Sequence, residues 1–279
     1  MRMVFRWFGT GNDTVTLKQV KQIPGVEGIV WALHHIPPGE IWPREEIAEV
    51  KRQADEYGLH TEVVESINVH EDIKLGLPSR DEYIANYKQT IEHLAEFGVK
   101  TICYNFMPVF DWVRTDLHKE LADGSTAMFY EKSKIMEIEP SELIATINEN
   151  PNRTMPGWEP EKLAHLSELF AAYRGVTEEK LRDNLQYFLQ EIIPVAARCG
   201  IQMAIHPDDP PWSIFGLPRI AGTQDNLRRI LQLVDSPSNC LTLCTGSLSA
   251  RPDVNLISMI DEFAERIAFV HIRNIMRYD

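Results

Sequence analysis

A recurring pattern of helix, glycine and apolar strand most constrains how this chain can fold. In three places an amphipathic stretch ends at a glycine and a short apolar run rich in strand-forming residues follows, at residues 56–65, 96–106 and 198–207. Gly58, Gly98 and Gly200 can each end a helix in the left-handed conformation, and a buried strand then begins. Nearly continuous apolar strands separated by amphipathic helices are typical of a parallel sheet that is covered on both faces.

The same pattern predicts seven strands and five principal helices. Strands are expected near residues 3–8, 28–33, 60–65, 100–106, 201–206, 240–244 and 268–273. Helices are expected at residues 43–58, 79–98, 177–200, 223–236 and 253–267. Thr177, Thr223 and Asp253 are the expected N-caps, and the spacing of Ser79 and Glu82 predicts a capping box.

A long stretch between the fourth and fifth strands predicts an insertion. Residues 107–175 are expected to lie on the catalytic face of one domain that covers 1–279, with helices within 141–150 and 159–175. A doubly wound sheet would carry a glycine-rich phosphate turn after its first strand, which Gly9 and Gly11 match only weakly. We therefore predict an α/β fold, a (β/α)₈ TIM barrel with a helical insertion after strand 4.

The eighth βα unit of this barrel is expected to be missing from the 279 residues. Strand seven ends near Arg273, only a few residues before Asp279, and a complete barrel with such an insertion should be longer. We therefore expect an open seam between the first and seventh strands.

Charge and cysteine usage exclude several classes of protein. Asp and Glu number 41 against 28 Lys and Arg, which gives a net charge of −13 and disfavours binding to nucleic acid or a membrane surface. No apolar run reaches the roughly 18 residues of a membrane span, and the N-terminus does not resemble a signal peptide. Four irregularly spaced cysteines indicate a reducing compartment, so we expect a cytoplasmic protein.

Three consecutive strands end in a nitrogen or sulfur donor. His206 follows the fifth strand, and Cys244 and His271 end the sixth and seventh. A single histidine in such a place is more often a hydrogen-bonded core or rim residue, but three donors on successive strands are far less probable by chance. Because parallel strand ends meet at one edge, the set predicts a site for Zn, Fe, Mn or Co.

Further polar residues follow the strand ends and are candidates for catalysis or substrate binding. Arg114 could bind a substrate carboxylate, although a surface ion pair with Asp111 or Asp116 is an equal alternative. One of Asp208 and Asp209 could act as a base or orient a neighbour, or both could belong to a solvated turn. We take Asp208 and Arg114 as the catalytic candidates. The substrate-binding candidates are Trp7, Glu65, Asn105, Asp111 and Arg273.

Six long segments resemble the D-mannonate dehydratase family, and the resemblance extends over essentially the whole chain. The segments are WFGTGND, GVEGIVWALHHIPPGEIW, VVESINVHEDIKLG, YNFMPVFDWVRTDL, AIHPDDPPWSIFGLPRI and LCTGSLSARPD. The resemblance implies a xylose-isomerase-like (β/α)₈ barrel and the conversion of D-mannonate to 2-keto-3-deoxy-D-gluconate and water in hexuronate breakdown. It implies a divalent metal, Mn²⁺ first and Fe²⁺ second, and no organic cofactor.

The family pattern also assigns ligands and partners. It places the metal ligands on His206, Cys244 and His271, with a fourth, an aspartate on strand eight, beyond Asp279. The expected partner is the small sugar acid D-mannonate, without nucleic acid or membrane, in a homo-oligomer for which a dimer is favoured. Two alternatives stay open: a metal-dependent sugar isomerase or epimerase on the same barrel, and a catalytically incomplete metal-binding barrel.

Overall fold

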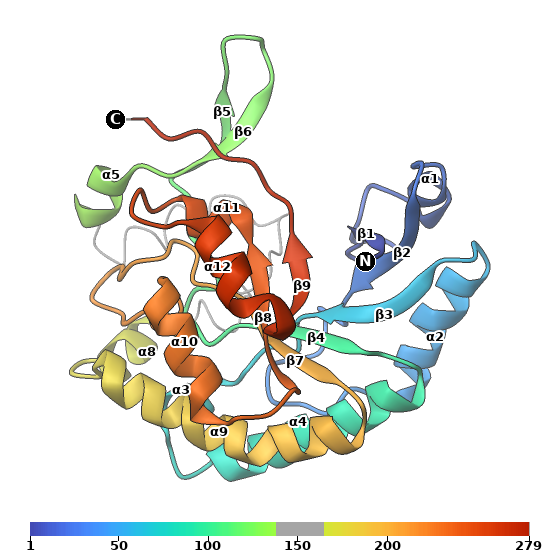
Figure 1. Cartoon of the computed structure of the whole chain (residues 1–279), viewed down its shortest axis with the longest axis horizontal. Coiled ribbons are helices and arrows are strands. Elements are labelled where there is room, and N and C mark those ends of the chain that lie inside the picture. The colour runs from blue at the N-terminus through green and yellow to red at the C-terminus, as the bar shows by residue number, and fades with distance from the viewer. Residues whose placement is uncertain (138–164, 279) are drawn as a thin grey trace.

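The computed structural model describes residues 1–137 and 165–278, and all structural statements below concern this part of the chain. Its centre is a curled sheet of seven parallel strands in the order β1-β2-β3-β4-β7-β8-β9 (Figure 1). The strands are β1 (Met3–Arg6), β2 (Val26–Trp31), β3 (His60–Glu65), β4 (Thr101–Tyr104), β7 (Gln202–Ile205), β8 (Asn239–Cys244) and β9 (Ile267–His271). All seven predicted strands are therefore confirmed, most of them shorter than expected.

Helices lie along the outside of this sheet (Figure 1). The helices of the main fold are α1 (Leu17–Lys21), α2 (Arg44–Asp55), α3 (Glu71–Leu75), α4 (Arg80–Glu96), α9 (Glu178–Arg198), α10 (Gln224–Leu233), α11 (Thr245–Ser249), α12 (Leu256–Phe263) and the 3-10 turn η1 (Ala264–Arg266). Gly58, Gly98 and Gly200 have φ of 61°, 86° and 66°, so the left-handed glycines are confirmed. No helix of the described ranges is long and apolar enough to cross a membrane.

Helix capping follows the prediction at two helices and departs from it at two others. Thr177 and Thr223 accept hydrogen bonds from backbone N–H groups in the first turns of α9 and α10. The cap of α12 is Asn255 instead of Asp253, because the helix begins two residues later. Ser79 makes no side-chain cap, since its hydroxyl donates to the Asp72 carboxylate at the preceding turn, and the predicted capping box was wrong.

The two edges of the sheet are β1 and β9. Within the described residues β1 pairs with β2, and β9 pairs with β8, so the curled sheet forms a half-barrel. All five residues of β9 are only partly buried, in contrast with the fully buried β8 beside it. The coarse expectation of a curled parallel sheet under helices is met.

The insertion contains a β-hairpin that the sequence analysis did not predict. It consists of β5 (Asp116–Glu120) and β6 (Thr126–Phe129), which pair antiparallel and project from the body in Figure 1. Gly124, in the turn between these strands, has a φ of 80°, a left-handed conformation that glycine adopts without steric cost. In the described residues of the insertion that follow, the helices are α5 (Lys132–Glu137) and α8 (Leu166–Ala172). The helix expected within 141–150 lies outside the described residues, and α8 falls within the one expected at 159–175.

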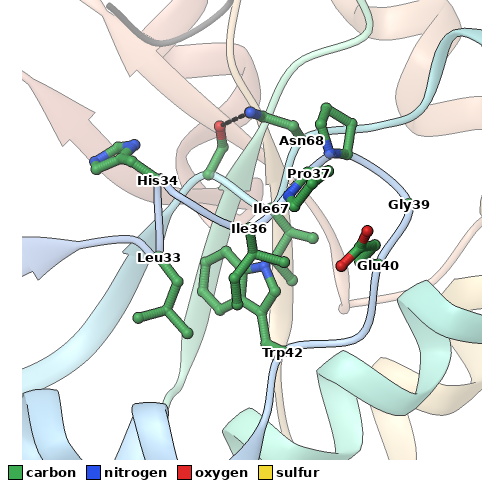
Figure 2. A pocket seen from close by; sticks show the side chains of 11 residues that line it. Leu33, His34, Ile36, Pro37, Gly39, Glu40, Trp42, Ile67 and Asn68 are labelled. Carbon is green, nitrogen blue, oxygen red and sulfur yellow. Dashed lines mark hydrogen bonds between the residues drawn. The ribbon is translucent and has the colours of Figure 1, made fainter. Parts of the chain in front are cut away.

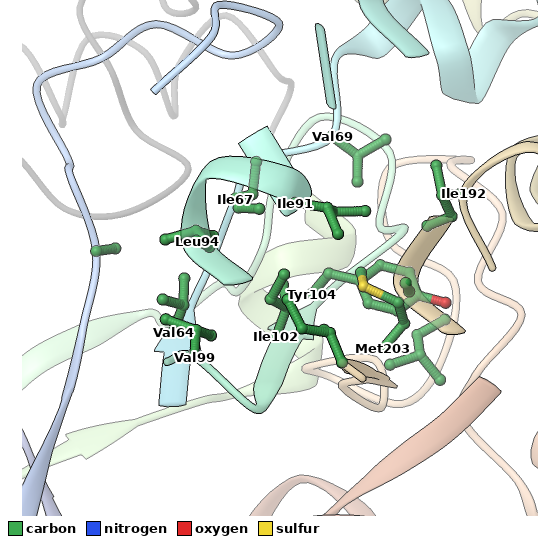
Figure 3. Packing of buried hydrophobic residues seen from close by; sticks show 14 of the residues in the cluster. Val64, Ile67, Val69, Ile91, Leu94, Val99, Ile102, Tyr104, Ile192 and Met203 are labelled. Carbon is green, nitrogen blue, oxygen red and sulfur yellow. The ribbon is translucent and has the colours of Figure 1, made fainter. Parts of the chain in front are cut away.

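The main core lies between the sheet and helices α4 and α9. Figure 3 shows Ile91 and Leu94 of α4 facing Ile102 of β4, with Ile192 of α9 beside Met203 of β7. Each such buried aliphatic side chain stabilises the fold by about 1.5–3 kcal/mol. This packing keeps the sheet rigid, so the carboxyl ends of the strands form a fixed platform.

A second, smaller core joins the insertion to the loop after β7. Its buried members are Val109, Phe110, Val113, Ile135, Leu166, Tyr173, Ile214 and Leu217. Polar contacts reinforce it at α3, where the Tyr173 hydroxyl donates to Glu71 Oε2 at 2.6 Å and Lys74 Nζ donates to the Met107 carbonyl at 2.8 Å. Both ends of the insertion are thus attached to the main fold.

Candidate metal centre and substrate site

The three strand-end donors lie together at the carboxyl edge of the sheet. His206 follows β7, and its backbone N–H donates to the Tyr104 carbonyl at the end of β4. Cys244 and His271 end β8 and β9 and are partners in the strand register. One potential ligand atom of each of the three lies within 4.8 Å of the others. The structure therefore brings His206, Cys244 and His271 together as one cluster of donors.

Neighbouring groups orient both imidazoles. His206 Nδ1 lies 2.7 Å from the Pro207 carbonyl oxygen, to which it can donate, and this leaves Nε2 toward His271 Nδ1 at 3.2 Å. His271 Nε2 lies 3.1 Å from Glu65 Oε2 on β3. A second hydrogen bond of this kind fixes which ring nitrogen is available to a ligand.

The charges in the cluster favour an ionised thiol. Burial opposes ionisation of Cys244, but hydrogen bonds from His206 and His271 outweigh it and lower the pKa of the thiol to about 4. Burial disfavours the charged form of His271 too, yet its bonds to Cys244 and Glu65 raise its pKa to about 9. Burial likewise opposes ionisation of Glu65, and its hydrogen bond with His271 keeps the pKa of that carboxyl well below its ordinary value. A thiolate beside two imidazoles is a donor set suited to a divalent transition metal, and a bound ion would displace the proton that His271 carries in its absence.

A second potential group of donors consists of Glu65, Cys103 and His271. Cys103, on β4, is a buried free cysteine. Burial raises the pKa of its thiol well above the ordinary value, and the Thr242 hydroxyl lies 3.2 Å from its sulfur. A neutral thiol is a weaker ligand than a thiolate, so this group is less suited to a metal than the first.

Helix α11, which follows β8 directly, holds the segment after β9 in place. The Thr245 hydroxyl lies 3.1 Å from the His271 carbonyl oxygen and 2.8 Å from that of Arg273, and it accepts from the Arg273 backbone N–H at 3.0 Å. The Ser247 hydroxyl lies 3.2 Å from Cys244 Sγ. These contacts connect Cys244 and His271 through the backbone that carries them.

Arg114 and Arg273 both bind the carboxylate of Asp209. Arg114 donates from Nη1 to Oδ1 at 2.8 Å and from Nη2 to Oδ2 at 3.0 Å, and Arg273 Nη2 donates to Oδ2 at 2.9 Å. The ion-pair partner of Arg114 is therefore Asp209, and not Asp111 or Asp116, the alternatives considered from the sequence. Burial opposes ionisation of Asp209, but the hydrogen bonds from Arg114 lower the pKa of its carboxyl to about 2.

Asp208, next to Asp209 in the chain, has different partners. Its Oδ2 accepts from the Ala221 backbone N–H at 2.6 Å, and its Oδ1 lies 4.0 Å from Arg219 Nη1. Burial raises the pKa of the Asp208 carboxyl. Arg219, which was not among the predicted site residues, is buried and donates to the Phe110 carbonyl at 2.9 Å. An arginine in a loop is usually exposed, so the residue type gives no signal of burial. The only signal in the sequence is that Arg219 lies within the family-like segment AIHPDDPPWSIFGLPRI.

The other predicted residues occupy separate positions. Asn105 Oδ1 accepts from the Met107 backbone N–H at 3.3 Å, and Asp111 is half-buried at the start of the insertion. Trp7 is buried and lines a hollow of about 710 Å³ between the loops after β1 and β2 and helix α2. This volume is in the range of small-molecule sites, but His206, Cys244 and His271 are not among its lining residues.

Figure 2 shows a second pocket, between the loops that follow β2 and β3. Leu33, His34 and Ile36 line one side of it, and Ile67 and Asn68 line the other. It holds about 10 Å³, roughly the space of one water molecule. It is therefore too small for a sugar acid.

The curled parallel sheet, with donors at its carboxyl edge, defines an α/β protein built on a half-barrel. More distant solved structures share this fold alone: 3-keto-D-glucoside 4-epimerase from E. coli has a TM-score of 0.52 at 16% identity, over 98% of this chain and 80% of that chain. The sequence model of D-mannonate dehydratase (UxuA) matches residues 1–279. The chain belongs to the D-mannonate dehydratase family.

Curated relatives and a solved structure agree with this family. The chain is 66% identical to mannonate dehydratase 1 of Halalkalibacterium halodurans over 100% of this chain and 77% of the relative. It is 60% identical to mannonate dehydratase of Bacillus subtilis over 100% and 78%. The crystal structure of mannonate dehydratase from Streptococcus suis serotype 2 has a TM-score of 0.87 at 44% identity, over 98% of this chain and 73% of that chain.

Proposed function

We propose that this chain eliminates water from D-mannonate to give 2-keto-3-deoxy-D-gluconate, with a divalent metal bound by His206, Cys244 and His271. The observation that carries the proposal is the convergence of these three donors at the ends of adjacent parallel strands, within 4.8 Å of one another. Membership of the D-mannonate dehydratase family supplies the reaction.

The residues present fit a divalent transition metal. Cys244 is ionised near neutral pH, and hydrogen bonds orient each imidazole so that one nitrogen faces the cluster. We propose Mn²⁺ as the ion and Fe²⁺ as the second choice. When bound, the ion would stabilise as a Lewis acid the negative charge that develops beside the substrate carboxylate.

Dehydration requires that a proton leave C2 and a hydroxyl group leave C3, so a base and an acid are needed. We propose Asp208 for proton transfer, because burial raises the pKa of its carboxyl and makes its anion a stronger base. We propose that Arg114 and Arg273 bind the substrate carboxylate, since a guanidinium group offers paired N–H donors to it. Glu65 orients His271, and Trp7, Asn105 and Asp111 are proposed to contact the rest of the substrate.

We also propose the complete architecture of the chain. The half-barrel would be part of a (β/α)₈ barrel in which an eighth βα unit pairs with β1 and β9, the two edges of the sheet in the described residues. Residues 107–175 would cover the catalytic face within one domain, and the protein would form a homodimer. Light scattering on the purified protein measures its molar mass and so tests the proposed homodimer.

The experiment that tests the function combines metal analysis with a keto-acid assay on D-mannonate. Replacing His206, Cys244 or His271 with Ala should lower the bound metal per chain and abolish product formation. The matched control is His165→Ala, because the His165 side chain is 67% exposed and its Nδ1 lies 3.1 Å from the exposed Glu168 carboxylate. Full metal content in all three site variants would overturn the proposed site.

A further inference from the structure

Asp209 is the common partner of two arginines that come from distant parts of the chain. Arg114 belongs to the insertion and Arg273 to the segment after β9, and each donates to the Asp209 carboxylate at 3.0 Å or less. The Asp209 and Arg114 side chains are 9% and 12% exposed. Because the carboxylate bridges the two guanidinium groups in a largely buried place, it fixes their separation and orientation.

The charge of this triad is not balanced. Two guanidinium groups and one carboxylate carry a net charge of +1. A guanidinium group has five N–H donors, and Asp209 accepts only three hydrogen bonds from the pair. Arg114 Nη1 also donates to the Val113 carbonyl, and Arg273 Nη2 also donates to Ser247. Arg273 Nε is buried without a hydrogen-bond partner among the described residues, although the Arg273 side chain as a whole is 37% exposed. A monoanion that enters the site would therefore find positive charge and unused donors in a fixed arrangement.

Helix α11, which follows β8, also holds Arg273 in place. The Ser247 hydroxyl lies 3.0 Å from Arg273 Nη2 and 3.2 Å from Cys244 Sγ, and it donates to Asp209 Oδ2 at 3.2 Å. A Cβ atom on Gly246 would lie 2.0 Å from Arg273 Nε, so only glycine lets the guanidinium stem lie across this helix. Ser247 therefore contacts both Arg273 of the arginine pair and the proposed metal ligand Cys244.

We infer that Asp209 is a positioning residue that holds Arg114 and Arg273 as a ready-made pair for the carboxylate of the sugar acid. The inference rests on the proposed function and deepens it, since it identifies which group makes the site select an acid over a neutral sugar. Holding the donors in place before the substrate arrives lowers the entropy lost on binding. Asp209 itself need not touch the substrate.

The test is Asp209→Asn, measured with the metal-loaded protein. Asparagine keeps the size of the side chain but loses the charge that binds both arginines. KM for D-mannonate should rise about 10- to 100-fold, the range for losing positioned hydrogen bonds to a charged group, while kcat changes far less. Glu96→Gln is the control, because Arg44 binds Glu96 in the same bidentate way at exposed positions on α2 and α4.

Equilibrium binding of D-mannonate separates this inference from the proposed function. Calorimetry on the metal-loaded parent and on Asp209→Asn should show weaker binding in the variant, with equal metal content, even if turnover were absent. Binding of D-mannitol, which has a CH₂OH group where D-mannonate has its carboxylate, should be equally weak in both. An affinity for D-mannonate that stays equal or increases would overturn the inference, because Asp209 would then only compete with the substrate for the arginines.

A second variant tests the pair from the other side. In Gly246→Ala the new methyl group must displace Arg273, whereas Asp209 and Arg114 are unchanged. We expect the affinity for D-mannonate to fall by a factor similar to that in Asp209→Asn. The weak binding of D-mannitol should again be unchanged. If Asp209→Asn does not fold, unchanged D-mannonate affinity in Gly246→Ala overturns the inference by itself.

Discussion

Tyr173→Phe should destabilise the protein by removing a single buried hydrogen bond that attaches the insertion to the main fold. The Tyr173 hydroxyl donates to Glu71 Oε2 at 2.6 Å, and the two residues are 3% and 8% exposed. Phenylalanine fills the same space, so no cavity forms. The change therefore isolates the hydroxyl from the packing of the second core.

The magnitude follows from the charge and burial of the acceptor. Hydrogen bonds to charged groups contribute about 1.5–3 kcal/mol. Without the hydroxyl, the Glu71 oxygen keeps a long contact of 3.4 Å with the Val109 backbone N–H, and the other oxygen keeps Lys74 Nζ at 2.9 Å. Because these partners remain, we expect a loss within this range, which corresponds to a Tm lower by roughly 3–12 °C.

Tyr187→Phe is the matched control for this measurement. The Tyr187 hydroxyl also donates to a carboxylate, Asp81 Oδ1 at 2.8 Å, but the Asp81 side chain is 68% exposed. Water replaces such a bond readily, so the loss should stay within about 0.5 kcal/mol. Urea unfolding followed by circular dichroism measures both variants. Equal losses in the two would refute the reasoning that burial of the acceptor sets the cost.

The main fold could be predicted because each of its signals is local. The left-handed glycines stop their helices, and the apolar runs that follow can only be satisfied inside a covered sheet. Once the strands are parallel, topology alone brings their carboxyl ends to one edge. This is why His206, Cys244 and His271 could be selected as a cluster although up to 65 residues separate them in the chain.

The features that could not be predicted depend on contacts between distant residues or on choices between similar residues. The hairpin β5–β6 is exposed along most of its length and lacks the apolar alternation that marks a buried strand. Arg114 had acidic neighbours at residues 111 and 116, yet it pairs with Asp209, 95 residues away. Asp253 and Asn255 are both good caps, and only the packing of α12 determines where the helix begins.

Three further predictions follow from the structure. Cys244→Ser should weaken metal binding by more than roughly 10- to 100-fold, which is the usual loss when a residue that hydrogen-bonds a metal ligand is removed. The reason is that a serine hydroxyl stays protonated where the thiol is ionised. Competition with a chelator measures the affinity for the metal. Phe188→Ala should cost about 3–5 kcal/mol in urea unfolding, because the ring is fully buried and its centroid lies 5.1 Å from that of Tyr87. Burial, and then the nearby Arg6, lower the pKa of His34 from 6.5 to about 4. The folded protein therefore binds fewer protons than the unfolded chain between these values, and stability should fall as the pH falls through this window, by at most about 3 kcal/mol from this residue. In His34→Gln the unfolding free energy should depend less steeply on pH between 6.5 and 4, and the same slope in parent and variant would contradict a neutral, half-buried His34.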